Sequence, residues 1–224
     1  MEGYRHENKY FISRAGYEML RSRLQAALEA DGHAGMDHRY MIRSLYFDDY
    51  AQSGLFDKVE GVKTREKFRI RFYDMDDSFI RLETKQKHDM MTRKISAPLT
   101  REQTQRILDG DIWFLYDTGQ PLLQDFYIKY RTRLLRPTVI VDYMREAYIY
   151  QDVRITFDLD LQTGNYASRL FDPAIVTIPV FSSDQIILEI KFDEKLPFSV
   201  RQLLKPVSAV RSAISKYELC RQFQ

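Results

Sequence analysis

A short run in the first half of the chain alternates cationic side chains with large apolar ones. Lys67, Arg69 and Arg71 alternate with the apolar residues Phe68, Ile70 and Phe72. Because successive side chains of a β-strand point to opposite faces, the cations share one face and the apolar residues share the other. No acidic residue is interleaved among the cations, so the row repels itself unless a polyanion lies along it. The run therefore predicts a strand with a polyanion-binding face.

The same alternation recurs in four other segments, three of which also contain acids. These are residues 80–87, 130–133, 153–161 and 187–192. Strands of this kind can form an open sheet whose charges face solvent as structural ion pairs. They can also close into a barrel that is polar inside, covered by helices outside and hollow enough for a ligand. The recurrence of the pattern favours the barrel.

If the phased residues line one cavity, its surface is strongly cationic with a few acids. The cations would be Arg5, Lys9, Arg43, Lys67, Arg69, Arg71, Lys85, Arg131, Arg133, Arg154, Lys191 and Lys216. The acids would be Glu7, Glu83, Asp158 and Glu189. Arginine can bind two phosphate oxygens at once, lysine supplies a point charge, and a few carboxylates suit a hard divalent ion that is shared with phosphates. These residue types predict phosphoryl transfer, where catalysis is mostly positioning and charge neutralisation.

Composition and missing motifs narrow the class of protein. The 224 residues are 44% hydrophobic and carry a net charge of +2, which indicates a globular protein and argues against a nucleic-acid-coating protein. The sequence contains no P-loop, dinucleotide-binding glycine motif or nucleophile elbow, and its four histidines lack zinc-ligand spacing. Cys220 is the single cysteine, and we find neither a signal peptide nor a run of ~20 apolar residues. We expect a soluble, cytoplasmic protein without a membrane segment.

The elements that must position these residues can be placed from local signals. We expect strands at 5–12, 42–49, 67–73, 79–87, 91–95, 128–136, 138–144, 153–161 and 185–192. Helices are expected from a Ser13 cap to about Ala30, from a capping box at Thr100–Gln103, over 111–127, after Pro197, and from a Ser208 cap. No linker or repeat divides the chain, so residues 1–224 are predicted to form one α+β domain.

Eight short motifs occur in an order that resembles a known family. They are ENKY at 7–10, SLYFD at 44–48, KFRIRFY at 67–73, ETK at 83–85, YRT at 130–132, VRITFD at 153–158, LEIK at 188–191 and SKY at 215–217. Together they resemble the catalytic domain of the vacuolar transporter chaperone (VTC) family of polyphosphate polymerases. This domain belongs to the triphosphate tunnel metalloenzymes, which are related to the CYTH group. The resemblance covers nearly the whole chain.

The resemblance implies a fold and a set of site residues. The fold would be an eight-stranded antiparallel β-barrel tunnel with flanking helices, whose basic lumen holds a triphosphate and a divalent metal, Mn²⁺ or Mg²⁺. Lys9, Arg69, Arg71, Lys85 and Lys216 would be the catalytic cations, and Glu189 would be the main metal ligand, with Glu7 and Glu83 as second ligands. Further phosphate contacts would come from Lys58, Lys67, Arg131, Arg133, Arg154 and Lys191. One departure is Arg5, which stands where CYTH relatives carry the first acid of a Glu-x-Glu-x-Lys motif.

The function implied by the resemblance is ATP-dependent polyphosphate polymerisation. The terminal oxygen of a growing chain would attack the γ-phosphate of ATP, with ADP leaving. Two alternatives remain open, namely a metal-dependent hydrolase of tripolyphosphate or nucleoside triphosphates, and a non-catalytic polyphosphate sensor. A nucleic-acid binder ranks last, because the aromatic residues lie on the opposite strand face from the cations. The expected partners are ATP, inorganic triphosphate and polyphosphate.

Overall fold

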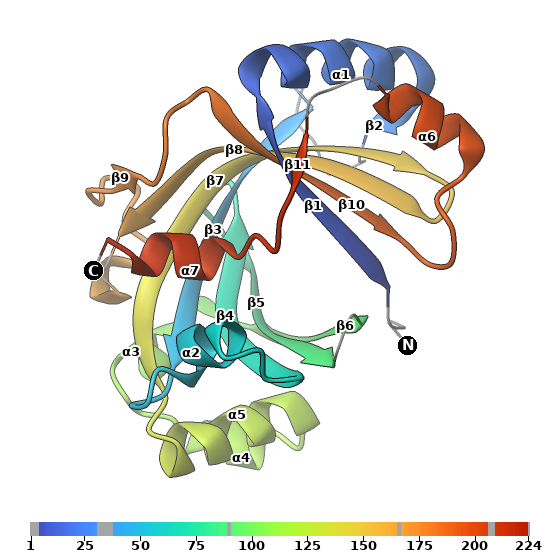
Figure 1. Ribbon diagram of the computed structural model, residues 1–224. Helices are drawn as coiled ribbons and strands as arrows, with labels where there is room; N and C mark the ends of the chain where they lie inside the picture. Colours follow the sequence, from blue (N-terminus) through green and yellow to red (C-terminus); the bar gives the residue numbers. More distant parts are fainter. Residues whose placement is uncertain (1–4, 31–37, 89–90, 165–166, 206–208, 224) are drawn as a thin grey trace.

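The protein is described from a computed structural model that covers residues 5–30, 38–88, 91–164, 167–205 and 209–223. Within these residues one antiparallel sheet organises the chain (Figure 1). Its long strands are β1 (His6–Ser13), β3 (Arg39–Asp48), β4 (Thr64–Tyr73), β5 (Asp76–His88), β6 (Met91–Leu99), β7 (Arg136–Tyr150), β8 (Val153–Gly164) and β10 (Gln185–Phe192). The short strands β2 (Glu29–Ala30), β9 (Ile178–Pro179) and β11 (Val210–Arg211) extend it.

The sheet curves around so that its two ends approach each other. The strand order is β11-β1-β10-β8-β7-β3-β4-β5-β6, with β2 beside β7 and β9 beside β8. At the seam, an isolated antiparallel bridge joins Arg5 to Thr92, and the Arg5 amide lies 3.5 Å from the Thr92 carbonyl oxygen. The long strands are the eight that the predicted antiparallel tunnel requires. The fold prediction is confirmed, although the described residues close the seam with a bridge rather than a continuous ladder.

The apolar faces of the strands point outward and are covered by helices. Phe68, Ile70 and Phe72 of β4 belong to one core, together with Ile107 of α3 (Arg101–Leu108) and Phe126 of α5 (Pro121–Thr132). A second core joins β8 and β10 to the buried side of α1 (Arg14–Ala27). In Figure 1, α1 lies at the top of the molecule and α4 (Phe114–Asp117) and α5 lie at the bottom. Because these apolar strand faces pack against the helices on the outside, the charged faces of the same strands point inward.

Local signals placed two helix starts correctly. The Ser13 hydroxyl caps α1 by accepting a hydrogen bond from the Gly16 amide at 3.1 Å. Thr100 and Gln103 form the predicted capping box of α3, in which each side chain accepts a hydrogen bond from the backbone amide of the other residue. The other helices are α2 (Ser53–Val59), α6 (Phe198–Leu204), α7 (Lys216–Arg221) and a 3₁₀ turn, η1 (Ala167–Arg169). No helix of the described residues is long and apolar enough to span a bilayer.

Two element predictions are wrong. Residues 128–132 continue α5 instead of forming a strand, because Leu122, Leu123, Phe126 and Tyr130 bury one face at helical spacing. The last helix begins at Lys216, where the Ser215 hydroxyl accepts from the Glu218 amide, while Val210 and Arg211 form β11. The predicted cap at Ser208 lies outside the described residues.

Candidate functional site

The curved sheet encloses a cavity of about 1220 Å³. Among the described residues, fourteen cations line it: Arg5, Lys9, Arg65, Lys67, Arg69, Arg71, Lys85, Lys87, Lys94, Arg145, Arg154, Lys191, Arg211 and Lys216. Five acids line it with them: Glu7, Asp152, Glu189, Asp193 and Glu218. Although the whole chain carries a net charge of only +2, cations dominate this cavity. The cavity therefore attracts anions through local arrangement rather than through total charge.

The β4 cations are held in place by neighbours on the same wall. The Arg69 guanidinium donates to Glu83 Oε2, with Nε–O and NH2–O distances of 2.8 and 2.6 Å, and to the Tyr46 hydroxyl at 2.9 Å. The Arg71 guanidinium donates to the Ser44 hydroxyl at 2.9 Å and to the Tyr143 hydroxyl at 3.0 Å. These bonds fix the planes of both guanidinium groups before any ligand arrives, which favours bidentate binding of phosphate oxygens.

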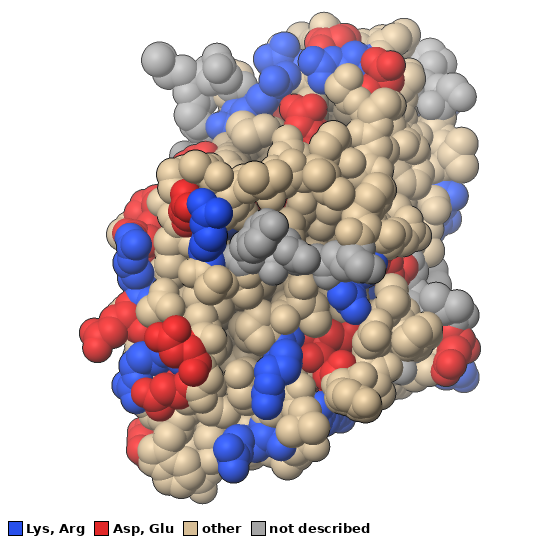
Figure 2. All heavy atoms as spheres, turned by 90° about the vertical axis from the view of Figure 1, so that its left-hand side faces the viewer, with Lys and Arg blue, Asp and Glu red and all other residues tan. Residues whose placement is uncertain are grey.

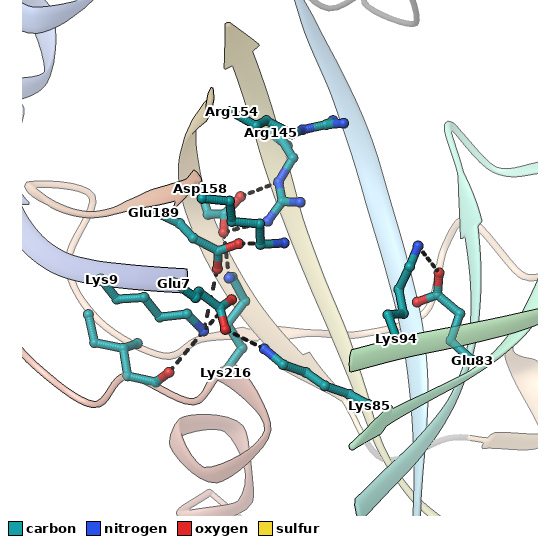
Figure 3. A network of polar contacts seen from close by, with 12 residues as sticks. Glu7, Lys9, Glu83, Lys85, Lys94, Arg145, Arg154, Asp158, Glu189 and Lys216 are labelled. Atoms are coloured by element: carbon teal, nitrogen blue, oxygen red, sulfur yellow. Dashed lines mark hydrogen bonds and ion pairs between the residues drawn. The ribbon is translucent and has the colours of Figure 1, made fainter. Parts of the chain in front are cut away.

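Glu189 of β10 is the centre of the charge network on the opposite wall. Its carboxylate lies 3.4 Å from Lys9 Nζ and 2.9 Å from Lys191 Nζ, and its side chain is almost fully buried. Lys9 Nζ also lies 3.5 Å from Glu7 Oε1, so the one ammonium group bridges two carboxylates. Figure 3 shows these side chains converging from β1 and β10.

A second carboxylate, Asp158 of β8, is buried next to this centre. Arg145 of β7 binds both of its oxygens, with N–O distances of 2.6 and 2.9 Å, and Lys216 of α7 forms an ion pair with it. Asp158 thus attaches the last helix to the tunnel wall (Figure 3). Arg145 and Lys216 also line the cavity, so their contacts with Asp158 do not remove them from its wall.

One ion pair crosses the cavity from β5 to β1. Lys85 Nζ donates to Glu7 Oε2 at 2.7 Å, across the seam where the ends of the sheet meet. Lys94 of β6 lies 3.3 Å from Glu83 Oε1 on the same side as Lys85 (Figure 3). Because Lys85 is bound to a single carboxylate, its ammonium group can exchange this partner for a phosphate.

The pKa values of the site follow from this crowding. Burial alone would raise the pKa of Glu189, but Lys191 and Lys9 hold it well below its usual value. Burial and the repulsion of Lys9 lower the pKa of Lys85 to about 8. Burial opposes ionisation of Tyr46, yet Arg69 and Arg71 lower the pKa of its hydroxyl to about 8. The neighbouring charges therefore favour the ionised form of Glu189, and they bring the pKa values of Lys85 and Tyr46 to about 8.

The acids present fit a divalent ion only in part. Among the described residues, no three Asp, Glu, His or Cys side chains converge on one point. Glu83 does not join Glu7 and Glu189, because Arg69, Arg71 and Lys94 hold it on the other wall. The pair Glu7 and Glu189, which share Lys9, fits an ion bound by one or two carboxylates and completed by substrate phosphates.

The structure brings most of the predicted site residues together. Predicted cations that line the cavity are Arg5, Lys9, Lys67, Arg69, Arg71, Lys85, Arg154, Lys191 and Lys216. Arg131 and Arg133 do not line it, because they are exposed at the end of helix α5 rather than on a strand. Lys58 lies in α2, but its side chain is outside the described part of the structure.

Arg43 was also expected to line the cavity and does not. It pairs in register with Phe72, so it points to the outer, apolar face of β3, where it is buried. There its guanidinium binds Asp142 with N–O distances of 2.7 to 3.1 Å and donates to the carbonyl oxygens of Leu170 and Asp172. Arg43 is thus a structural residue that fastens the segment around η1 to the sheet.

Sequence reasoning missed two cavity residues that contact the central carboxylates. Arg145 binds Asp158, and Lys94 binds Glu83. Arg145 was missed because the strand predicted at 138–144 in fact runs on to Tyr150, which keeps Tyr143 and Arg145 in phase. Lys94 was missed because Arg93 directly precedes it, and two adjacent cations break the alternation of charged and apolar residues that marks a strand face.

Comparisons with known proteins agree with this architecture. The family model described as "VTC domain" matches residues 4–223. An adenylyl cyclase-like protein from Hippeastrum has a TM-score of 0.58 and 14% identity, covering 98% of this chain and 96% of that one. A Pyrococcus horikoshii protein has a TM-score of 0.51 and 11% identity, with 98% and 100% covered. An adenylate cyclase-like protein from Vibrio parahaemolyticus has a TM-score of 0.50 and 10% identity, with 96% and 97% covered. No curated protein matches the sequence significantly.

Proposed function

Because the chain belongs to the VTC domain family, we propose that it is an ATP-dependent polyphosphate polymerase. The γ-phosphate of ATP would pass to the end of a polyphosphate chain inside the cavity, and ADP would leave. The observation that carries the proposal is the placement of cations on facing walls around buried carboxylates (Figure 3). Lys85 and Lys94 stand on one wall, and Lys9 and Arg145 stand on the other. Two polyanions can meet in such a cavity only if both are neutralised from several sides.

The residues of this chain would act by positioning and by electrostatics. Arg69 and Arg71, whose planes are already fixed, would hold phosphate oxygens of the triphosphate from the β4 wall. Lys9, Arg145 and Lys216 would hold the opposite side, with Glu189 and Asp158 keeping their ammonium and guanidinium groups oriented. A divalent ion bound at Glu7 and Glu189 would offset negative charge that develops on the phosphates. Direct transfer between the two anions needs no covalent intermediate on the protein.

A second candidate is hydrolysis of a triphosphate, with water as the acceptor. One similar structure, that from Hippeastrum, is described as having a dominant triphosphatase activity. The hydrolase would need nearly the same cations and carboxylates, because the scissile bond is of the same kind. The two reactions differ only in the group that attacks the phosphorus atom.

The two reactions differ in their products, so the test is to measure all products at once. Purified protein is incubated with ATP and Mn²⁺ or Mg²⁺, and ADP, free phosphate and long-chain polyphosphate are quantified together. ADP with polyphosphate and little free phosphate would support the polymerase. ADP with an equal amount of free phosphate would support the hydrolase. Binding of ATP and tripolyphosphate without turnover would overturn both proposals and leave a sensor.

A cytoplasmic location is part of this proposal, since ATP is available there. It is supported by Cys220, the only cysteine of the chain, which is buried and unpaired.

A further inference from the structure

Tyr143 of β7 contacts three cations of the cavity with a single side chain. It is 3% exposed and lines the cavity. Its hydroxyl accepts a hydrogen bond from Arg71 Nη2 at 3.0 Å. The centroid of its ring lies 4.8 Å from Lys216 Nζ and 5.3 Å from Arg145 Cζ. Because the three cations belong to β4, α7 and β7, Tyr143 connects the two walls of the cavity.

The position of Tyr143 follows from strand order and from the alternation of side chains. β3 lies between β4 and β7, and its residue Ser44 pairs in register with Arg71. Tyr143 and Arg145 are two residues apart on β7, and both line the cavity. The Tyr143 ring therefore lies beside Arg145, and its hydroxyl reaches across β3 to Arg71. Contacts of both kinds need a ring face for the cations and a hydroxyl at the far end of the ring, which tyrosine combines.

Arg71 is oriented by hydroxyl groups more than by a carboxylate. Besides its bond to Tyr143, its Nε donates to the Ser44 hydroxyl at 2.9 Å, whereas its ion pair with Glu83 has an N–O distance of 3.9 Å. Arg69, in contrast, lies 2.6 Å from the same carboxylate. Hydroxyl oxygens orient a guanidinium without adding the full negative charge of a carboxylate. Tyr143 therefore helps to fix Arg71 and leaves its positive charge available to an anion.

We propose that Tyr143 is a positioning residue, which keeps the three cations that it contacts directed at one segment of the phosphate chain. The proposal rests on the proposed function, since it takes phosphoryl transfer to occur in the cavity. The hydroxyl sets the angle of Arg71, and the ring holds Lys216 and Arg145 by cation–π attraction. Loss of these contacts should affect turnover more than binding, because misplaced cations still attract an anion but stabilise the transition state less well.

Steady-state kinetics, measured as release of ADP from ATP, separate the role of the hydroxyl from that of the ring. Tyr143→Phe keeps the ring and removes the bond to Arg71, so we expect kcat to fall about tenfold while KM stays within about twofold. Tyr143→Leu also removes the ring, and its kcat should fall about a hundredfold. Melting temperatures are measured on the same samples. A lower melting temperature with wild-type kcat and KM in both variants would show a role in stability alone and would overturn the proposal.

NMR of ¹⁵N-labelled arginine guanidinium groups tests the contact without requiring turnover. The Arg71 signal is assigned with an Arg71→Lys variant. In the wild type its guanidinium protons should exchange slowly with water, and in Tyr143→Phe they should exchange about tenfold faster, since one acceptor is lost. Arg43, which binds Asp142 on the outer face of the sheet, is the internal reference and should not change. Arg71 exchange that is equal in the wild type and the variant would overturn the proposal.

Tyr73 gives a matched control within the same cavity. It is the last residue of β4 and lines the cavity, but in the described part of the chain its hydroxyl binds no cation. Tyr73→Phe should leave kcat, KM and the exchange of the Arg71 guanidinium at their wild-type values. An equal fall of kcat in Tyr73→Phe and Tyr143→Phe would overturn the specific role of Tyr143.

The positioning role and the proposed function can fail separately. Wild-type turnover of ATP together with unchanged kcat in both Tyr143 variants would overturn the positioning role alone. Binding of tripolyphosphate without turnover in the wild type would overturn the proposed function. Faster exchange of Arg71 in Tyr143→Phe would then still support Tyr143 as the residue that orients this guanidinium.

Discussion

At the scale of single residues, the site is a set of carboxylates that hold cations ready for phosphate. Glu189 is the clearest case, because its carboxylate is almost fully buried between Lys9 and Lys191. Its negative charge orients these ammonium groups and, in our proposal, binds the divalent ion. Removing only the charge should therefore separate binding from catalysis.

We expect Glu189→Gln to lower turnover of ATP by about two orders of magnitude. Tripolyphosphate binding should be kept or become tighter, because the cavity loses one negative charge. Product formation and equilibrium binding are measured side by side, and Glu194→Gln, at an exposed position, is the control. Wild-type turnover in the Glu189 variant would contradict the assigned role.

The lowered pKa of Lys85 predicts how the affinity of the cavity for anions depends on pH. Its pKa is lowered to about 8 by burial and by Lys9, so its ammonium group loses its proton as pH rises through 8. Tripolyphosphate affinity should fall over this range and should be accompanied by proton uptake. In Lys85→Arg the positive charge persists to much higher pH, so the fall in tripolyphosphate affinity should be smaller.

Tyr46→Phe is the control variant, because it removes the other group whose pKa is about 8. Identical pH profiles for Lys85→Arg and the wild type would exclude Lys85 as the titrating group.

At the scale of elements, side-chain contacts attach the last helix, α7, to the strands of the tunnel. Lys216 binds Asp158 of β8, and Tyr217 donates to the buried carboxylate of Asp48 at the end of β3. The other oxygen of Asp48 accepts from the Gly54 amide at 2.9 Å. A Cβ atom at position 54 would lie 3.0 Å from that oxygen, so glycine permits the close approach. Through Lys216, the attachment of α7 determines one part of the cavity wall.

Tyr217→Phe tests this attachment. The variant leaves one oxygen of the Asp48 carboxylate buried without its donor, so the free energy of unfolding should fall by about 1–3 kcal/mol. Amide exchange in α7 should become faster while the β4 and β5 amides stay protected. Urea denaturation and hydrogen exchange measure the two effects. Tyr116→Phe, at a side chain that is 48% exposed, should leave both unchanged. Unchanged stability in Tyr217→Phe would show that this hydrogen bond does not hold the helix.

At the scale of the whole molecule, charge is distributed unevenly between inside and outside. Figure 2 shows one outer face on which Lys and Arg side chains are interspersed with Asp and Glu among uncharged residues. The cavity, in contrast, is lined by fourteen cations and five acids of the described residues. Anion binding should therefore depend on which cations are removed and not on the net charge.

Two double variants with the same net charge test this expectation. Lys67→Ala with Lys191→Ala and Arg131→Ala with Arg133→Ala each change the formal net charge from +2 to zero. At about 100 times its Kd, tripolyphosphate should raise the free energy of unfolding by about 2.7 kcal/mol in the wild type and the α5 variant. The cavity variant should lose most of this stabilisation. Equal losses in both variants would show that net charge, and not the cavity, controls binding.

The local sequence was enough to predict most of the strands and, for the central strand, the face on which its charges lie. Alternation at period two depends only on neighbouring residues, so the facing of Lys67, Arg69 and Arg71 could be read directly. The caps at Ser13 and Thr100 are equally local and were found. Arg131 was predicted on a strand because its segment alternates charged and uncharged residues. In the structure the segment is helical, because Phe126 and Tyr130 bury one face of α5, with Phe126 against Phe68 of β4.

Which charged residues contact one another could be seen only once the chain was folded. Arg43 resembles the other phased cations in sequence, but its register with Phe72 turns it outward to Asp142. Glu83 and Glu189 are both strand acids, and the curvature of the sheet places them on different walls with different cations. Such pairings join residues far apart in the chain, as Lys85 and Glu7 do, and they depend on strand order and register that no local pattern encodes.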